Sequence, residues 1–389
     1  INLIGVFIKN MQTSNQSKPS AFKIIPFVIF LLGGLICGAF IGWSLASFTD
    51  RLPESPYPLA LAIMTIILTL AFFAQLIIHE AGHLVFGLLS GYRFSSFRVG
   101  SLMLFREDGH LRLKSFSLAG TGGQCLMIPP QGRENDFPFA RYLLGGVWMN
   151  FLVGALFALL YLLTVSGSLV SVLFGAIALT GFVVGLMNAI PLHLAMVDND
   201  GFTVRLMRKD PQAVAAFHRM MQIHSQIAAG FRLKDMPEEW FLTPALADTS
   251  NSIIATIEVY RCNRLLDEEN FKETADSIRA LLASGAAITG IHRSLLLCDL
   301  AYCALMQDDP NEATRLLDEQ QLRFMQSMKR FPGLLRTQYA LALLRDHDEA
   351  AAADIQTKFD RIADRYPYQS DIASERALMN AAQKKSIPA

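Results

Sequence analysis

The chain has 389 residues, of which 52% are hydrophobic and only 17% are charged, and its mean hydropathy is +0.33. This composition is too apolar for an ordinary soluble protein of this length and indicates a membrane protein. The 34 Lys and Arg residues balance the 34 Asp and Glu residues, so no net positive charge attracts nucleic acid. We therefore expect a lipid bilayer, and no nucleic acid, among the partners of the chain.

The cysteines do not form the pattern of a disulfide framework or a zinc knuckle. Their number is odd, and none is spaced as Cys-x-x-Cys. The first residues lack the basic segment, apolar core and small-residue cleavage site of a signal peptide, so no removable signal is expected. We interpret the five cysteines as buried thiols: Cys37, Cys125, Cys262, Cys298 and Cys303.

Four apolar segments are long enough to cross a hydrocarbon layer about 30 Å thick, which takes about 20 helical residues. We predict these spans at 24–48, 59–91, 142–165 and 169–190. The second would be roughly 50 Å long as one helix, so it must tilt, break or leave the bilayer. In the first, glycines at 34, 38 and 42 form a ridge that would let another helix approach closely, although a plain anchor explains them equally well.

Basic residues are concentrated on one side of these four spans. They are frequent before the first span, in the loop between the second and third, and directly after the fourth, whereas the opposite loops hold only Arg51. The positive-inside rule then places both termini and the long middle loop in the cytoplasm. The compact four-span form favours a bacterial cell membrane.

A β-hairpin is predicted within the middle loop. Residues 101–107 and 110–116 alternate apolar and polar side chains around Asp108-Gly109, a dipeptide typical of a type I′ hairpin turn. The following Gly122 and Gly123 indicate irregular backbone and are interpreted as turn residues. We expect the hairpin to be an element of the membrane surface.

Beyond Gly201 the sequence has the pattern of a soluble helical domain, with apolar positions at helical spacing and charges between them. We predict that three helix pairs repeat in it. With Ala275, Ala313 and Ala350 as markers, the spacings are 38 and 37 residues, near the tetratricopeptide period of about 34. The predicted fold is therefore an all-α polytopic membrane protein with about four transmembrane helices, a small β-hairpin, and a C-terminal cytoplasmic helical, TPR-like domain.

The second apolar segment contains His79-Glu80-Ala81-Gly82-His83, an HExxH pattern. Residues i and i+4 share one face of a helix, so the two imidazoles can point at one metal ion while Glu80 flanks its open side. An ionisable group at the bilayer centre costs about 2.5 to 3.5 kcal/mol, and coordination to a metal offsets this cost. We therefore predict that His79 and His83 are metal ligands rather than a hydrogen-bonded structural pair.

A catalytic zinc site takes a third protein ligand and leaves the fourth position to water. The fourth apolar segment is broken by Pro191 and is followed by two carboxylates, Asp198 and Asp200. Either aspartate can reach back to the metal, and His193 is a third candidate.

These motifs resemble those of the site-2 protease family of intramembrane zinc metalloproteases. Its members pair an HExxH helix with a later helix that bears Asn-x-x-Pro and then Asp-Gly. Asn188 and Pro191 match the first part and Asp200-Gly201 the second, although Asp-Gly follows the proline more closely in the commonest family form. The resemblance covers residues 59–201 and implies Zn²⁺ as the cofactor and Asp200 as the third ligand.

A looser match concerns the third apolar segment, where residues 145–150 read Gly-Gly-Val-Trp-Met-Asn. They are similar to the family's Gly-x-x-x-Asn, which implies that Asn150 faces the site as a catalytic residue. An interhelical hydrogen bond is an equally good explanation of an asparagine there. The resulting domains are 1–56 with one transmembrane helix, 57–202 as the catalytic membrane core with the hairpin loop at about 93–140, and 203–389 as the helical repeat-like domain.

The resemblance implies hydrolysis of peptide bonds in membrane proteins or membrane-bound peptide precursors. Zinc would lower the pKa of a bound water toward about 7, and Glu80 would move its proton to the leaving amine. Asn188 would donate a hydrogen bond to the substrate or to the developing oxyanion. The edge of the hairpin could hold the substrate extended, or the hairpin could be a lid on the membrane surface.

Two other functions are compatible with the same residues. One is a catalytically silent membrane scaffold with a structural metal site, although such a site has no need for Glu80. The other is a transporter of metal or small solutes, although the first and third spans contain no further ionisable residues. The C-terminal domain is predicted to recruit a substrate or a protein partner, or else to form a helical cap.

Overall fold

The computed structural model describes residues 21–51, 57–107, 110–116, 121–130, 137–193, 196–243 and 248–387. Internal contacts divide the chain into two compact units. One unit consists of Ile1–Phe72 and Val153–Val183, and the other consists of Phe73–Leu152 and Val184–Ala389.

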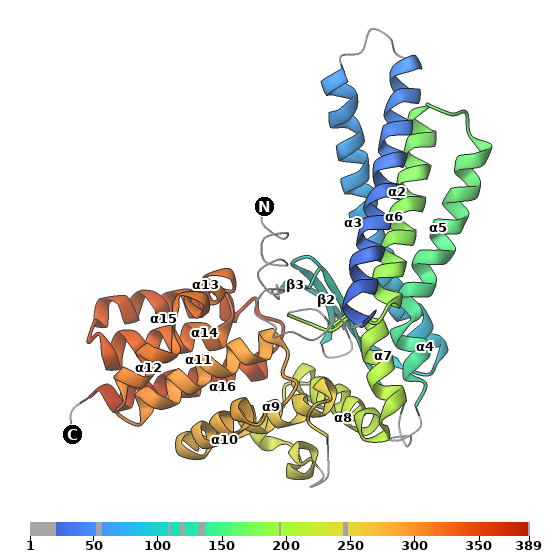
Figure 1. Ribbon diagram of the computed structural model, residues 1–389. Helices are drawn as coiled ribbons and strands as arrows, with labels where there is room; N and C mark the ends of the chain where they lie inside the picture. Colours follow the sequence, from blue (N-terminus) through green and yellow to red (C-terminus); the bar gives the residue numbers. More distant parts are fainter. Residues whose placement is uncertain are drawn as a thin grey trace. The chain divides into compact units, whose positions relative to one another are not determined.

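Four long apolar helices run alongside one another in Figure 1: α2 (Ala21–Arg51), α3 (Tyr57–Leu89), α5 (Gly145–Leu163) and α6 (Leu169–Ala189). Among the described residues, these four helices are long and apolar enough to cross a membrane. In α3 only 17% of the most apolar window is buried, so most of its apolar side chains face outward, as side chains in contact with lipid do. This agrees with the number and positions of the predicted spans.

The first unit is held together by apolar contacts between these helices. Leu45 and Phe48 of α2 pack with Ala60 and Met64 of α3 and with Val172 of α6. The glycine ridge of α2 is not part of this contact, because a Cβ added at Gly34, Gly38 or Gly42 would meet no described atom within 4 Å. Within the described part of the chain the ridge therefore packs against no other helix.

The third span begins later than predicted. A short helix, α4 (Phe139–Leu143), contains Tyr142 and ends at Leu144, and α5 starts only at Gly145. The predicted continuous helix from residue 142 is therefore wrong at its start. The break matters for the site, because the carbonyl of Tyr142 lies at the helix end, where it accepts both a backbone N–H and a hydrogen bond from a histidine side chain.

The middle loop forms a four-stranded antiparallel sheet rather than the single hairpin predicted. Its order is β3 (His110–Ser115), β2 (Leu102–Glu107), β1 (Arg93–Val99) and β4 (Gly123–Ile128). Strands β2 and β3 are the predicted hairpin, with Glu107 opposite His110, while the turn residues Asp108 and Gly109 lie outside the described residues. Gly123, expected in irregular backbone, is the first residue of β4.

The two faces of the β2–β3 hairpin differ. Met103 and Phe105 are buried against residues of the helical domain, among them Tyr366 and Tyr368. Leu102, Leu111 and Leu113 point to the other face and are 62%, 59% and 67% exposed. This alternation buries one face of the hairpin in the protein core. The leucines of its other face remain largely exposed among the described residues.

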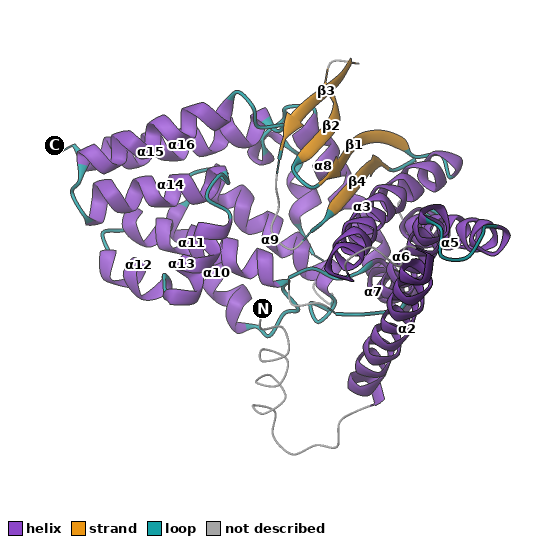
Figure 2. Cartoon of the chain, turned by 90° about the horizontal axis from the view of Figure 1, so that it is seen from above, coloured by secondary structure: helices purple, strands orange, loops and turns teal. Residues whose placement is uncertain are grey.

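The remainder of the chain is helical (Figures 1 and 2). After the two helices that follow the fourth span, α7 (Asp200–Lys209) and α8 (Pro211–Ala228), come two short 3₁₀ turns, η1 (Leu233–Asp235) and η2 (Glu238–Phe241). The C-terminal bundle then comprises α9 (Ser252–Asp267), α10 (Phe271–Ala283), α11 (Gly290–Met306), α12 (Pro310–Leu316), α13 (Glu319–Ser327), α14 (Pro332–Ala340), η3 (Leu341–Arg345), α15 (Glu349–Ala363) and α16 (Gln369–Ser386).

Three helix pairs of this bundle share one turn geometry. Before α10, α12 and α15 stands a non-glycine residue with positive φ, and these residues, Glu269, Asp308 and His347, have a constant spacing of 39 residues. At the same spacing, Thr274, Ala313 and Ala352 are buried at the helix contacts. This turn and the buried helix contact therefore recur every 39 residues, where the prediction had spacings of 38 and 37, and their register differs by one or two residues from the markers Ala275 and Ala350.

Among the described side chains, the cysteines are free and buried, as predicted for Cys125, Cys262, Cys298 and Cys303. Three of them lie in the core of the C-terminal bundle. The side chain of Cys37 lies outside the described residues.

Candidate metal centre

The HExxH segment lies in the C-terminal half of α3, where this helix passes very close to α5. A Cβ added at Gly82 would lie 2.4 Å from the carbonyl oxygen of Gly145, and one added at Gly145 would lie 2.6 Å from that of Gly82. Only two glycines facing each other allow the helix backbones this approach. It brings His79 and His83 against the start of α5 and the break that precedes it.

The third segment of the site comes from the turn between α6 and α7. Helix α6 ends at Ala189, two residues before Pro191, which cannot continue the helical hydrogen-bond pattern. Asn199 caps α7 by accepting a hydrogen bond from the amide of Phe202, and the cap makes Asp200 the first helical residue. A carboxylate at that position is favoured by the helix dipole.

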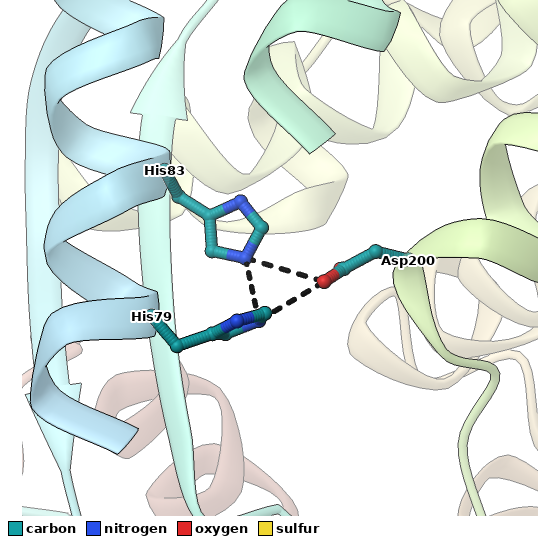
Figure 3. A group of neighbouring side chains, drawn as sticks. All are labelled: His79, His83 and Asp200. Atoms are coloured by element: carbon teal, nitrogen blue, oxygen red, sulfur yellow. Dashed lines mark hydrogen bonds and ion pairs between the residues drawn. The ribbon is translucent and has the colours of Figure 1, made fainter. Parts of the chain in front are cut away.

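His79, His83 and Asp200 converge at one point, as Figure 3 shows. The Nε2 atoms of the two histidines are 3.1 Å apart, and they lie 3.0 Å and 3.4 Å from Oδ2 of Asp200. Both histidines are buried, with exposed fractions of 6% each, and the Asp200 side chain is 20% exposed. The structure thus assembles three ligand atoms from residues 121 positions apart in the chain.

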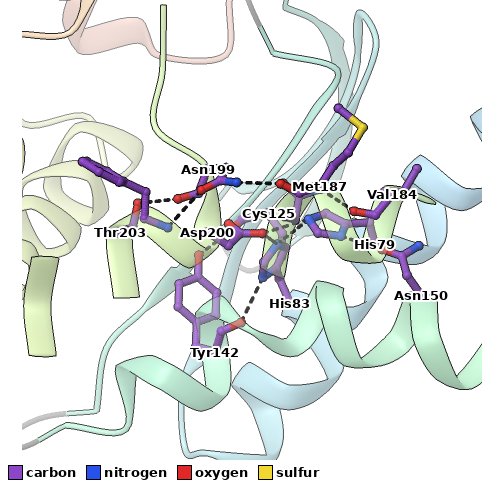
Figure 4. A network of polar contacts seen from close by, with 12 residues as sticks. His79, His83, Cys125, Tyr142, Asn150, Val184, Met187, Asn199, Asp200 and Thr203 are labelled. Atoms are coloured by element: carbon purple, nitrogen blue, oxygen red, sulfur yellow. Dashed lines mark hydrogen bonds and ion pairs between the residues drawn. The ribbon is translucent and has the colours of Figure 1, made fainter. Parts of the chain in front are cut away.

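The outer ring nitrogens fix how the two histidines are turned (Figure 4). Nδ1 of His79 lies 2.7 Å from Oδ1 of Asn150, and Nδ1 of His83 lies 2.9 Å from the carbonyl oxygen of Tyr142. Both partners are acceptors, so in each ring Nδ1 carries the proton and Nε2 presents its lone pair to the site. The Asn150 amide is oriented in turn, because its Nδ2 donates to the backbone and side-chain oxygens of Gln75 at 3.0 Å and 2.8 Å.

This donor set fits a zinc ion. Two imidazole nitrogens and one carboxylate oxygen are ligands that zinc takes in catalytic sites, and at bond lengths of about 2.0–2.1 Å tetrahedral ligand atoms are about 3.3 Å apart. The three separations here are close to that value. The group can hold a metal ion.

Comparison with models of known protein families, with curated proteins and with solved structures finds no match.

Glu80 lies beside the two histidines on α3 and faces strand β4. A Cβ added at Gly123 would lie 2.5 Å from Oε1 of Glu80, so the carboxylate fills the space that a side chain at this strand position would take. Figure 2 shows β4 as the edge of the sheet nearest α3. The sequence signal for this contact was the Gly122-Gly123 pair, which we interpreted as a turn.

The other predicted site residues lie in different surroundings. Nδ2 of Asn188 donates to the carbonyl oxygen of Val184 in its own helix at 3.0 Å. Asp198 turns away from the metal group: its carboxylate accepts hydrogen bonds from Nδ1 of His193 and from Oγ of Ser252, both at 2.6 Å. Among the two aspartates and His193, the structure brings only Asp200 together with His79 and His83.

Asn199 is a structural residue of the site that sequence reasoning missed. Besides capping α7, its Nδ2 donates to the carbonyl oxygens of Met187 and Ile190 at 2.6 Å and 2.7 Å, and its Oδ1 accepts from the amide of Leu192 at 3.1 Å. It therefore ties the unwound end of α6 to the start of α7, where the ligand stands. The available signal was an asparagine directly before Asp-Gly, in the position of a helix N-cap.

Proposed function

We propose that the chain is an intramembrane zinc metalloprotease of the site-2 protease type, which hydrolyses peptide bonds of membrane-embedded proteins or peptide precursors. The observation that carries the proposal is the group of His79, His83 and Asp200, with Glu80 beside it, on a helix apolar enough to span a membrane. A three-ligand group leaves a position for water, whereas structural zinc sites have four protein ligands.

The residues divide the chemistry between them. A zinc ion held by the three ligands would activate a water molecule and polarise the scissile carbonyl. Glu80 would act as the general base of an HExxH site, taking the proton of that water and passing it to the leaving amine. Asn150 and the carbonyl of Tyr142 hold the two imidazoles in the tautomer that leaves Nε2 free. Asn188 remains our candidate for a donor to the substrate.

The substrate must be extended near Glu80, because a helix hides its peptide bonds in internal hydrogen bonds. We expect β4 to bind it, because β4 is the outer strand of the described sheet and its first residue contacts Glu80. The hairpin that we expected to present the substrate is at the opposite edge of the sheet. Its exposed leucines suit the second expected role, contact with the membrane surface.

For the C-terminal bundle we propose a TPR-like module that binds a protein partner on the cytoplasmic side of a bacterial membrane. The 39-residue repeat supports the module. A groove of about 830 Å³ between α9 and α10, with Arg261, Lys272 and Glu273 in its lining, is where we expect a polar peptide to bind. The positive-inside pattern supports cytoplasmic termini.

The decisive experiment measures zinc content and cleavage together on the purified full-length protein. The wild type should carry zinc and cleave a panel of single-span membrane substrates. Asp200→Asn should lose the metal, and Glu80→Gln should keep it while cleavage falls by at least about 100-fold, the lower range for a general base. Asp235→Asn, at an exposed carboxylate in η1, is the matched control and should retain both properties.

The outcome also separates the protease from a membrane scaffold. Zinc in the wild type and in Glu80→Gln, with no cleavage by either, would favour a structural metal. Absence of zinc from a folded wild-type protein would refute the metalloprotease.

A further inference from the structure

The three residues of the metal group are supported by two different parts of the chain. His79 and His83 are held by Asn150 of α5 and by the backbone at Tyr142 of α4. Asp200 follows the connection between α6 and α7, and this connection packs on the C-terminal helical bundle. Met196 and Val197 are partly buried against the bundle core, which includes Val259, Cys262 and Leu266 of α9.

A hydrogen bond joins the same connection to the first residue of α9. Oγ of Ser252 donates to Oδ2 of Asp198 at 2.6 Å, and the Asp198 side chain is only 9% exposed. The other carboxylate oxygen accepts from Nδ1 of His193, and the same two residues form an isolated β-bridge. A carboxylate so far removed from water requires such partners, so Ser252 is part of what keeps this connection in place.

Asp198 lies only two residues before Asp200, so the position of the connection also determines the position of Asp200. Asn199, between Asp198 and Asp200, is 7% exposed and uses its side chain to bond four backbone groups of α6, α7 and the turn. Gly201, on the other side, packs so closely that a Cβ would lie 2.4 Å from the carbonyl oxygen of Ala189. Asp200 therefore has little freedom to move independently of Asp198.

We propose that the helical bundle is a working part of the metal centre, in which Ser252 is a positioning residue that acts through Asp198 to hold Asp200 at the metal. The inference rests on the proposed zinc site and adds a role for the bundle. A shift of the start of α9 moves Asp200, the third ligand, while His79 and His83 keep their hydrogen-bond partners. Outer partners of metal ligands commonly change metal affinity by about 10- to 100-fold.

The test uses the full-length protein loaded with Co²⁺ in place of Zn²⁺, because the visible absorption of Co²⁺ reports ligand geometry. Ser252→Ala should weaken Co²⁺ affinity about tenfold and change the visible band, and Ser252→Thr, which keeps the hydroxyl, should restore both. Ser250→Ala, an exposed serine two residues earlier, is the matched control and should leave affinity and spectrum unchanged.

A second variant keeps the test independent of any damage to α9. Asp198→Ala removes the same bond from the other side, and the double variant with Ser252→Ala should lose no more affinity than Asp198→Ala alone, because both act through one interaction. Wild-type affinity and spectrum in Ser252→Ala, or fully additive losses in the double variant, would overturn the inference while leaving the zinc site intact. A folded wild type that binds no metal would overturn both.

Discussion

Asn150 makes an interhelical hydrogen bond, which is one of the two explanations that its motif allows. Its Oδ1 accepts the Nδ1 proton of His79, and its Nδ2 is held by Gln75. The side chain is completely buried and contacts the outer nitrogen of the ring rather than the metal side. It therefore orients the His79 ring, and the catalytic role that the resemblance implied stays a prediction.

Replacement of this amide should weaken metal binding. Asn150→Leu removes the acceptor that fixes the His79 tautomer, and zinc affinity should fall about 10- to 100-fold, as for other partners of metal-bound histidines. Competition with a chromophoric chelator measures this. Asn150→Asp retains an acceptor for His79 and should bind zinc more tightly than Asn150→Leu; equal affinities of the two variants would contradict the orienting role.

The residues of the site could be predicted to different extents for physical reasons. His79, Glu80 and His83 follow from helix geometry, because i and i+4 side chains share a face whatever surrounds them. Asp200 and Asp198 could not be separated by periodicity, since Asp198 is engaged by a hydrogen bond from Ser252, which lies 54 residues beyond it. His83 is held by the backbone carbonyl of Tyr142. Every residue has such a carbonyl, so the sequence gives no signal of this contact.

At the scale of elements, the close contact between α3 and α5 places the two histidines against the start of α5. Gly82 lies between the two ligands in sequence and touches Gly145 through backbone atoms alone. Backbone cannot move aside as the end of a flexible side chain can, so this contact tolerates no added atom.

Gly82→Ala should therefore separate the two helices and disturb both histidines. We expect a loss of about 1 to 3 kcal/mol in stability, typical of overpacking, and a more than tenfold loss of zinc affinity. Thermal unfolding and chelator competition measure the two effects. Gly38→Ala, in α2, adds the same methyl group where no described atom lies within 4 Å; if it costs as much as Gly82→Ala, the close contact is not the cause.

Among the strands, only the hairpin was predictable, because its Asp-Gly turn and its alternation are local signals. β1 and β4 are joined to each other across 23 residues, with a register shift between Phe94 and Ser96, and irregular pairing of this kind hides the alternation on which recognition depends. The four long helices were predictable because an apolar run long enough to cross a bilayer can be recognised from the local sequence alone. The end of α4 was missed because Gly145 and Gly146 are as apolar as the helix around them.

For the whole molecule, stability depends on pH through partly buried groups in α8 and in the C-terminal bundle. Burial, with Glu375 and Asp267 nearby, raises the pKa of Asp371 to about 7. The native state therefore holds a proton on Asp371 that the unfolded chain releases near pH 4, and stability falls as pH rises from about 4 to about 7. Burial lowers the pKa of His224 and of His292 to about 4, which has the opposite sign: stability falls as pH drops below about 6.5.

Asp371→Asn isolates the first of these effects. The variant should melt several degrees higher than the wild type at pH 8, because it removes a partly buried charge. The difference should shrink as the pH falls toward about 4, where the native wild-type residue is neutral and the unfolded one is only about half ionised. Melting temperatures across this pH range are the measurement. Asp364→Asn, at an exposed carboxylate, should show little of this trend, and a pH-independent gain in Asp371→Asn would refute the explanation.

His79 and Asp200 are 121 positions apart in the chain, and this separation also sets an order of events during synthesis. When α3 has left the ribosome, only two ligands exist, and the chain must still make the sheet, insert α5 and α6, and begin α7 before the third is available. The three residues can therefore hold a metal ion together only late in synthesis. On the proposed function, a newly made molecule cannot act as a hydrolase before the start of α7 has been made.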